Sequence, residues 1–276
     1  MVVGLGNCKL LTVNCTLYMK LLEGKKGLII GLANDKSIAW GISQRCHEHG
    51  AELGFNFQNE ILEKRVRPLV ESLGAKFVEE CAADSDESII KFFDTVEKKF
   101  GKIDFLVHSI AHANGDDLKN RFHLTSREGF KHALDVSAYS LIRMVAEAKR
   151  IFNPGASVIA MTYHGAERVC PNYKVMGVAK AALEASVREL AADLGHEGIR
   201  VNAVSAGPIK TLASAGVSDF KSLMKSFEEV APLRKRVTQE DVGNAAVYLL
   251  SDMSSSVTGE IHYVDCGFNV VAGAAA

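Results

Sequence analysis

Residues 27–41 run Gly27-Leu28-Ile29-Ile30-Gly31-Leu32-Ala33-Asn34-Asp35-Lys36-Ser37-Ile38-Ala39-Trp40-Gly41. The first five are apolar between two glycines, which is typical of a short buried strand. A polar turn follows, and Ser37 stands at the start of a segment with helical period that reaches His49. A strand, a glycine-bounded turn and a helix in this order predict the first unit of a parallel α/β sheet.

The same alternation continues along the chain. Further strands are predicted at 51–57, 75–79, 103–110, 157–163, 200–205 and 261–264. Helices are predicted at 38–49, 61–72, 85–100, 127–151, 178–194, 220–229 and 238–250. The last of these begins with Thr238-x-x-Asp241, which resembles a capping box. This order predicts one doubly wound, Rossmann-type α/β domain, a seven-stranded parallel sheet with helices on both faces.

Two stretches between these elements are predicted to be irregular. A polar loop is expected from about residue 111 to Leu124, and a flexible stretch is expected after Gly207-Pro208. Asn153-Pro154-Gly155 is predicted to stop the helix that precedes the strand at 157–163.

Composition and charge exclude several classes of function. The 276 residues are 47% hydrophobic and 24% charged, which suits one large folded domain. The 32 Lys+Arg and 33 Asp+Glu leave a formal net charge of -1, without the basic excess of a nucleic-acid binder. No apolar run approaches the about 20 residues that a membrane span requires. The six cysteines show neither C-x-x-C nor zinc-ligand spacing, so we expect reduced thiols, a cytoplasmic location and no metal site.

The two ends of the chain are expected to lie outside the domain. Residues 1–18 lack a basic segment and a cleavage site, and a second start-like segment begins at Met19. We expect 1–18 to be an appendage from an upstream start, 19–271 to be a dinucleotide-binding catalytic domain, and 272–276 to be a frayed tail. A weak organelle-targeting peptide is the alternative for 1–18, and the lack of arginine there argues against it.

The carboxyl ends of the predicted strands are where such a sheet binds its ligand, against a helix N-terminus. The turn between Gly31 and Gly41 is longer than G-x-G-x-x-G, and by itself it also fits a plain connection. The second strand ends at Gln58, where a dinucleotide fold often has an acidic residue for the ribose diol. An amide here, with no Arg or Lys directly after it, favours NADH over NADPH. A solvent-facing strand end is the other interpretation of Gln58.

Two tyrosines and a lysine form a candidate catalytic group. Tyr173 and Lys180 are seven residues apart, which predicts two turns along one helical face, and Tyr163 ends the preceding strand. A lysine among small residues needs a partner if it is buried, and cofactor ribose hydroxyls would supply one. Its charge would make the Tyr173 phenol a better donor to a developing oxyanion. Spacing alone also fits an exposed lysine on a helix that starts with an aromatic residue.

The pattern Tyr163-x9-Tyr173-x6-Lys180 resembles the divergent branch of the short-chain dehydrogenase/reductase superfamily, specifically the bacterial NADH-type enoyl-acyl-carrier-protein reductases. Ordinary members of the superfamily carry Tyr-x-x-x-Lys and an upstream serine, whereas this chain has the longer spacing and an upstream tyrosine. The resemblance extends over about residues 20–271. It is also carried by residues 37–39, 125–131, 165–168, 171–182, 200–211 and 240–244.

The resemblance implies a role for each matching residue. Tyr173 would polarise the thioester carbonyl and stabilise the enolate, Lys180 would hold the nicotinamide ribose, and Tyr163 would gate or orient the substrate. The cofactor would contact Gly31, Ser37, Ile38, Gln58, Ala82, Ala83, Ser109, Ile110, Ala111, Lys180, Pro208, Ile209 and Thr211. The acyl substrate would contact Ala113, Tyr163, Tyr173, Met176 and Phe220.

Three residues depart from the family pattern. Cys266 stands where a glycine is common, and we expect it to affect packing rather than chemistry. Ala82 stands where the family usually has an aspartate that bonds the adenine amine. That contact is either missing or supplied by the backbone of Ala82 and Ala83, which puts cofactor affinity in doubt. His112 replaces a bulkier apolar residue beside the cofactor loop, and an exposed loop histidine is its simplest interpretation.

The implied activity is NADH-dependent reduction of the C2=C3 bond of a trans-2-enoyl thioester in type II fatty-acid synthesis, with NADPH less favoured. The substrate would be carried by acyl carrier protein, and the chain would form a homotetramer through the helices at 127–151 and 178–194. The acidic carrier would meet a basic patch, for which the candidates are Lys210, Lys221, Lys225, Arg234, Lys235 and Arg236. Such residues also fit an ordinary solvated face.

Two other functions compete with this one. A carbonyl-reducing short-chain dehydrogenase is disfavoured by the wide spacing of Tyr173 and Lys180 and by the missing upstream serine. A nucleotide-binding regulatory module without catalysis would be expected to lack Tyr173 or Lys180, and the sequence keeps both.

Overall fold

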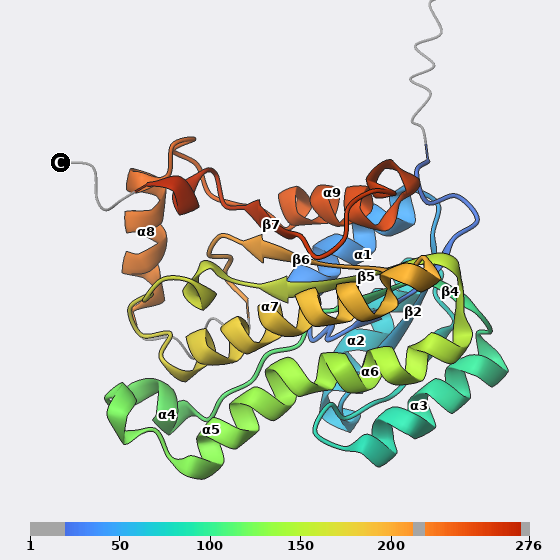
Figure 1. Cartoon of the computed structure of the whole chain (residues 1–276), viewed down its shortest axis with the longest axis horizontal. Helices are drawn as coiled ribbons and strands as arrows, with labels where there is room; N and C mark the ends of the chain where they lie inside the picture. Colours follow the sequence, from blue (N-terminus) through green and yellow to red (C-terminus); the bar gives the residue numbers. More distant parts are fainter. Residues whose placement is uncertain (1–19, 212–218, 272–276) are drawn as a thin grey trace, which may run out of the picture.

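The computed structural model describes residues 20–211 and 219–271. The predictions for residues 1–18 and 272–276, and most of the stretch after Gly207-Pro208, lie outside these ranges. Within them, seven parallel strands form one sheet in the order β3-β2-β1-β4-β5-β6-β7 (Figure 1). The strands are β1 (Lys26–Ile30), β2 (Glu52–Phe57), β3 (Phe77–Glu80), β4 (Ile103–His108), β5 (Phe152–Thr162), β6 (Arg200–Ala206) and β7 (Ile261–Val264). The predicted doubly wound, Rossmann-type fold is confirmed.

Helices cover both faces of the sheet. One face carries α1 (Ile38–Glu48), α2 (Glu60–Ser72), α8 (Phe220–Val230) and α9 (Gln239–Leu250). The other carries α3 (Asp86–Lys99), α6 (Ser140–Ala148) and α7 (Val175–Leu194). The predicted capping box of α9 is present, since the Thr238 side chain accepts from the Asp241 N–H and the Asp241 side chain accepts from the Thr238 N–H. None of the helices in the described residues is long and apolar enough to cross a bilayer.

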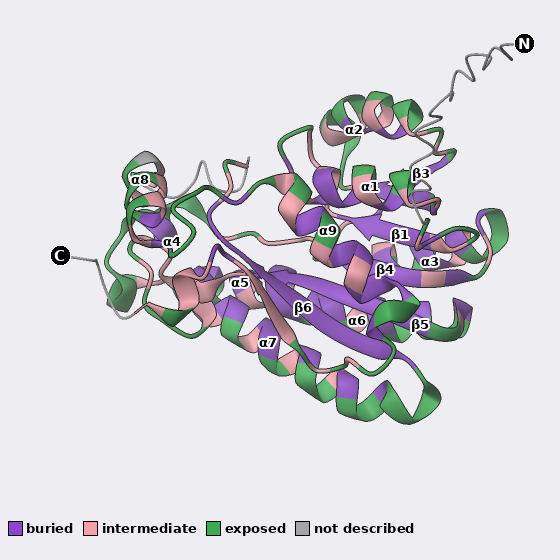
Figure 2. Ribbon diagram, turned by 90° about the horizontal axis from the view of Figure 1, so that it is seen from above, coloured by how far each residue is buried: buried purple, intermediate pink, exposed green. Residues whose placement is uncertain are grey.

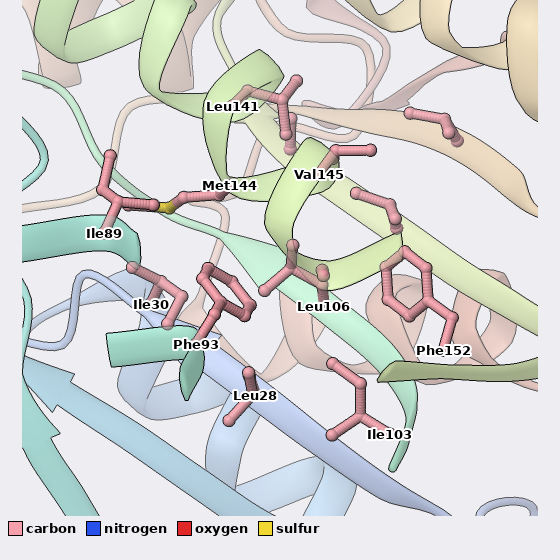
Figure 3. Packing of buried hydrophobic residues seen from close by; sticks show 14 of the residues in the cluster. Leu28, Ile30, Ile89, Phe93, Ile103, Leu106, Leu141, Met144, Val145 and Phe152 are labelled. Carbon is pink, nitrogen blue, oxygen red and sulfur yellow. The ribbon is translucent and has the colours of Figure 1, made fainter. Parts of the chain in front are cut away.

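The central strands are mainly apolar because they are buried on both faces. In β1, Leu28 and Ile30 enter the core cluster on one face, while Ile29 between them enters the cluster on the other. Figure 2 shows the central strands as buried and the outer sides of the helices as exposed. Figure 3 shows how the first cluster joins strand and helix side chains, among them Leu28, Ile30, Phe93, Leu106, Leu141 and Met144.

The helix predicted over 127–151 is not one regular helix. It consists of α5 (Arg127–Leu134), a π-helical turn (Asp135–Tyr139), α6, and a 3-10 turn at its end (Lys149–Ile151). Within the π-helical turn, Ser137 accepts a hydrogen bond from the His112 N–H at 3.0 Å. Such turns carry no period of their own in the sequence, which is why the interruption was not predicted.

The loop predicted over 111–124 is partly helical. It contains the short helix α4 (Gly115–Lys119) and a 3-10 turn (Phe122–Leu124). One turn of helix is too short to show a period, and it is stabilised by contacts from outside, such as the bond of 2.9 Å from the Ser126 N–H to Asp117 Oδ1. The prediction of an irregular loop is therefore wrong for this segment.

Strand β5 begins earlier than predicted. Phe152 already pairs with Ile103, and the ladder resumes at Ser157 opposite Phe105, so the residues between form a bulge at the predicted Asn-Pro-Gly stop. A bulge tolerates proline and glycine within a strand, which stop signals in the sequence do not reveal.

Candidate active site

A cavity of about 640 Å³ opens at the carboxyl ends of the strands, between α4, the start of α7 and α8. The strand order reverses between β1 and β4, which is the point where such sheets bind a ligand. Of the residues predicted for the site, Ala82 alone does not line this cavity. Those that do are Gly31, Ser37, Ile38, Gln58, Ala83, Ser109, Ile110, Ala111, Ala113, Tyr163, Tyr173, Met176, Lys180, Pro208, Ile209, Thr211 and Phe220.

Gly31 forms the floor of the first turn. Its φ is +100°, and a Cβ at this position would lie 2.2 Å from the carbonyl oxygen of Ser109. Its N–H donates to Asn56 Oδ1 at 2.9 Å, and Asn56 Nδ2 donates to the Cys81 carbonyl at 3.0 Å. The buried amide of Asn56 thus joins the ends of β1, β2 and β3. Asn56 was not predicted for the site, although a polar residue inside the apolar strand was the available signal.

Replacing Gly31 with alanine is expected to destabilise the fold by about 1–3 kcal/mol, because the new methyl group collides with backbone that cannot easily move. Urea unfolding measures the loss. Gly74→Ala is the matched control, since Gly74 has φ +70° and a Cβ added there would meet nothing within 4 Å. Its cost is limited to the positive φ, so equal losses in the two variants would contradict the collision at Gly31.

The rest of the first turn is held by Ser37. Its Oγ accepts hydrogen bonds from the N–H groups of Ala33 and Asn34, both at 3.1 Å. Ser37 is buried and precedes α1, so its side chain shapes the turn while it also borders the cavity.

Tyr173 does not lie on the helix that carries Lys180. Helix α7 begins at Val175, and Tyr173 sits in the turn before it, between Asn172 with φ 64° and Lys174 with φ 46°. The prediction that Tyr173 and Lys180 share one helical face is therefore wrong. Residues with positive φ angles lie outside the right-handed helical region, so the helix cannot extend back to Tyr173. Both side chains nevertheless line the same cavity.

The two tyrosines pack against each other. The rings of Tyr163 and Tyr173 meet edge to face, with centroids 4.8 Å apart and an interplanar angle of 71°. Burial is the main cause that raises the pKa of both phenols above the usual value, so both stay protonated and can donate. Tyr163 is also hydrogen-bonded to the thiol of Cys170, a cavity-lining residue that was not predicted for the site.

Lys180 lines the cavity and is buried, with 4% of its surface exposed. Its Nζ donates to the Met161 carbonyl at 2.6 Å and, more weakly, to the Ile110 carbonyl at 3.5 Å. Burial lowers the pKa of Lys180 to about 8, and the charge of Glu184 opposes this shift. The alternative of an exposed lysine is thereby excluded.

Glu184 lies behind the lining of the cavity and was not predicted from the sequence. It lies one helical turn after Lys180, is buried, and accepts a hydrogen bond of 2.6 Å from Thr162 Oγ1. Burial raises the pKa of Glu184, while the Thr162 bond and the charge of Lys180 lower it. The (i, i+4) spacing of opposite charges was the signal that could have found it.

His112 is exposed, as expected, but it is not isolated. Its Nδ1 lies 2.8 Å from His132 Nε2, the two rings meet edge to face, and both residues line the cavity. Burial and the charge of His132 lower the pKa of His112, and Asp84 opposes them. This pair links the loop after β4 to α5. The histidine that departs from the family pattern at position 112 is therefore held by His132.

Ala82 lies beside the cavity rather than on its wall. Its N–H donates to Ser88 Oγ at 2.9 Å, while the following residues Ala83 and Asp84 border the cavity. A backbone contact from Ala82 in place of the family's aspartate is thus disfavoured, and Ala83 is the better placed residue.

The basic residues near α8 are exposed and partly paired. Lys225 lies 3.7 Å from Glu229, Lys235 lies 3.6 Å from Asp241, and Arg236 lies 2.9 Å from Glu228. The side chain of Lys221 lies outside the described part of the chain.

Residues 20–211 and 219–271 contain no group of three His, Cys, Asp or Glu side chains arranged to hold a metal ion.

A seven-stranded parallel sheet, a glycine turn at its switch point, and a tyrosine and a lysine in the cavity there define a dinucleotide-dependent oxidoreductase. Comparison with known families gives the particular kind. The family model described as enoyl-(acyl carrier protein) reductase matches residues 31–269. The chain belongs to this enoyl-acyl-carrier-protein reductase family, as the resemblance had implied.

Individual relatives agree with this assignment. The chain is 53% identical over 251 residues to an enoyl-[acyl-carrier-protein] reductase [NADH] of Rickettsia prowazekii, covering 91% of this chain and 96% of the relative. The crystal structure of the Anaplasma phagocytophilum reductase in complex with NAD has a TM-score of 0.89 at 46% identity, covering 93% of this chain and 98% of that one. The Bacillus cereus reductase, solved with NADP+ and an indole naphthyridinone, has a TM-score of 0.90 at 48% identity, covering 92% and 100%.

Proposed function

We propose that this chain reduces the C2=C3 bond of trans-2-enoyl thioesters with NADH, as an enoyl-acyl-carrier-protein reductase. The observation that carries the proposal is that the Tyr173 phenol, whose raised pKa keeps it protonated, and the buried Lys180 line the same cavity. The relative from Rickettsia prowazekii bears the name of an NADH-dependent enzyme of this activity.

The residues around the cavity fit NADH. The turn at Gly31 leaves no room for a side chain and presents backbone at the start of α1, which suits a pyrophosphate. Gln58 and Ala83 would contact the adenosine end, Lys180 the nicotinamide ribose, and Thr211 the nicotinamide side. When bound, the reduced nicotinamide supplies a hydride to the β-carbon of the thioester.

The protein supplies position and electrostatics. As the β-carbon is reduced, negative charge gathers on the thioester oxygen, and the Tyr173 O–H donates to that oxygen. The enolate then takes a proton from solvent at its α-carbon, which completes the saturated thioester. Because burial raises the pKa of this phenol, its proton remains available. The charge of Lys180 would stabilise the developing anion, because a buried charge acts more strongly than one in water. Tyr163 and Met176 border the same cavity and would orient the acyl group.

The activity is expected to decline at alkaline pH. Lys180 has a pKa of about 8 in the folded protein, so its charge and its bonds to ribose are lost above that pH. We expect kcat/KM for NADH to fall above pH 8, because this parameter reports groups of the free enzyme. Stability should change in the opposite direction. Since the folded pKa lies below the usual 10.5, protonation in the fold is unfavourable below pH 8, and this penalty disappears as the pH rises from 8 to 10.5.

A steady-state profile from pH 6 to 10, with urea unfolding at the same pH values, tests both trends. A kcat/KM that stays flat to pH 10 would remove the ionised Lys180 from cofactor binding.

The competing function is reduction of a carbonyl group. Oxidation of NADH and of NADPH is measured with crotonyl and with acetoacetyl thioesters. We expect turnover of the crotonyl thioester with NADH as the better cofactor. Turnover of the acetoacetyl thioester alone would replace the proposal by the carbonyl-reducing one, and NADH binding without turnover of either would favour a regulatory module.

We further propose that the acidic carrier docks on the basic residues around α8, that the chain forms a homotetramer through α5, α6 and α7, and that it is cytoplasmic. Residues 19–271 are proposed as the catalytic domain.

Lys225→Glu together with Arg234→Glu is expected to raise KM for the carrier-bound substrate about 3- to 10-fold, because charges at the rim of an interface mainly steer association. KM for a coenzyme A thioester should stay unchanged in that variant. Lys102→Glu, at the other end of the sheet, is the control, and an equal KM for the carrier substrate in both variants would refute this docking surface.

A further inference from the structure

We propose that Lys174 is a positioning residue that ties the Tyr173 turn to α4 and so holds the Tyr173 hydroxyl in its place, an inference that rests on the proposed function. Lys174 precedes α7, and nothing in the sequence pattern singles it out. Its role follows from its contacts, its backbone conformation and the residues on each side of it.

The amine of Lys174 reaches the end of a distant helix. Its Nζ donates to the Leu118 carbonyl at 2.6 Å and to the Lys119 carbonyl at 2.8 Å. These are the last two carbonyls of α4, and the last carbonyls of a helix have no donors within the helix, so they need donors from outside. A charged donor is favoured at a helix C-terminus. The contact is therefore both specific and directed to backbone.

The backbone around Tyr173 needs to be held. Asn172 has φ 64°, and Lys174 has φ 46° and ψ -120°, a combination that suits glycine rather than lysine. Such conformations persist only where the surroundings hold them. Anchoring the far end of the Lys174 side chain to α4 is a direct way to hold the second of these two residues. Loss of the amine would let the turn relax and move the phenol.

The two ends of this tie lie on the wall where the acyl group would sit. Leu118, whose carbonyl accepts from Lys174, belongs to the apolar cluster of Val175 and Met176, and Tyr173 packs against that cluster. Leu118, Tyr173 and Met176 all border the cavity. On its other side the Tyr173 ring is confined by Gly165, where a Cβ would lie 2.5 Å from the ring. The phenol is thus fixed from the Gly165 side by packing and from the α4 side by the tie.

Four variants test the role. Lys174→Met keeps the side chain as far as the ε position and removes both bonds, and it is expected to lower kcat about 10-fold, with the Kd for NADH within twofold of wild type. Lys174→Arg can donate to both carbonyls and is expected to keep kcat within threefold. Lys174→Gly removes the tie but adopts the backbone angles without strain, so its kcat should lie between these two. Lys102→Met, an exposed lysine at the other end of the sheet, should match wild type.

A double variant separates positioning from general stability. If Lys174 acts through the Tyr173 hydroxyl, Lys174→Met should lower kcat less than twofold in a Tyr173→Phe background. Equal losses in both backgrounds, or a Lys174→Met enzyme with wild-type kcat, would overturn the proposal. Should Lys174→Met fail to fold, the comparison of Lys174→Gly with Lys174→Arg gives the same answer. A wild-type enzyme without turnover of crotonyl thioester would refute the proposed function instead.

Discussion

Replacing Tyr173 with phenylalanine is expected to lower kcat for a crotonyl thioester by about 10²- to 10³-fold, which is the usual loss when one donor to a developing oxyanion is removed. The ring would keep its edge-to-face contact with Tyr163, so the fold and the shape of the cavity should survive. The Kd for NADH should stay within twofold, since Lys180 rather than Tyr173 is assigned to the ribose. Steady-state kinetics and NADH fluorescence titration measure the two effects.

Tyr163→Phe is the matched control for this experiment. It also removes one phenolic hydroxyl from the cavity and leaves the ring pair intact, but that hydroxyl is engaged with Cys170. We expect a loss in kcat at least tenfold smaller than for Tyr173→Phe. Equal losses would mean that the two tyrosines share the donor role, and an unchanged rate in Tyr173→Phe would remove Tyr173 from the mechanism.

The second large effect is expected for Lys180→Met. Hydrogen bonds to charged groups contribute about 1.5–3 kcal/mol, so losing the ammonium should weaken NADH binding about 10- to 150-fold and lower kcat/KM at least as much. Stability should not fall in parallel. Burial disfavours the charge, as the pKa of about 8 shows, and below pH 8 the apolar replacement removes that penalty.

Measured together at pH 7, activity and thermal unfolding should therefore diverge in Lys180→Met. The melting temperature is expected to equal or exceed that of wild type while turnover collapses. Glu184→Gln is the companion variant, because it keeps an oxygen for the Thr162 hydroxyl but removes the charge that opposes the shift in Lys180. It should lower the pH at which kcat/KM declines. A Lys180→Met enzyme that binds NADH like wild type would refute the assigned role.

The strands and most helices could be predicted from the sequence because their signal is local. A buried strand such as β1 can be recognised as a short apolar run between glycines. The start of α9 can be recognised from the capping box of Thr238 and Asp241. The site residues that directly follow strands could be predicted for the same reason, since parallel strands bring their carboxyl ends to one edge.

The errors fall where distant residues determine the local structure. Helix α4 depends on Lys174, which is 56 residues from Leu118, and the turn at Tyr173 depends on the same contact. Three of the missed residues are of one kind: Asn56 acts through Cys81, Glu184 through Thr162, and His132 through His112. Each has a polar side chain whose importance is visible only when its partner is known, and one sequence does not reveal the partner.

The Asn56 amide restricts which residue types position 56 can accept during divergence. Its oxygen accepts from Gly31 while its nitrogen donates to Cys81, so one planar group presents opposite polarity to two strand ends. Aspartate has the same shape but would turn lone pairs toward the Cys81 carbonyl, and leucine would leave both backbone groups unsatisfied. Few other residues can therefore replace Asn56, and this one side chain sets the spacing between the turn at Gly31 and the segment at Cys81, both of which border the cavity.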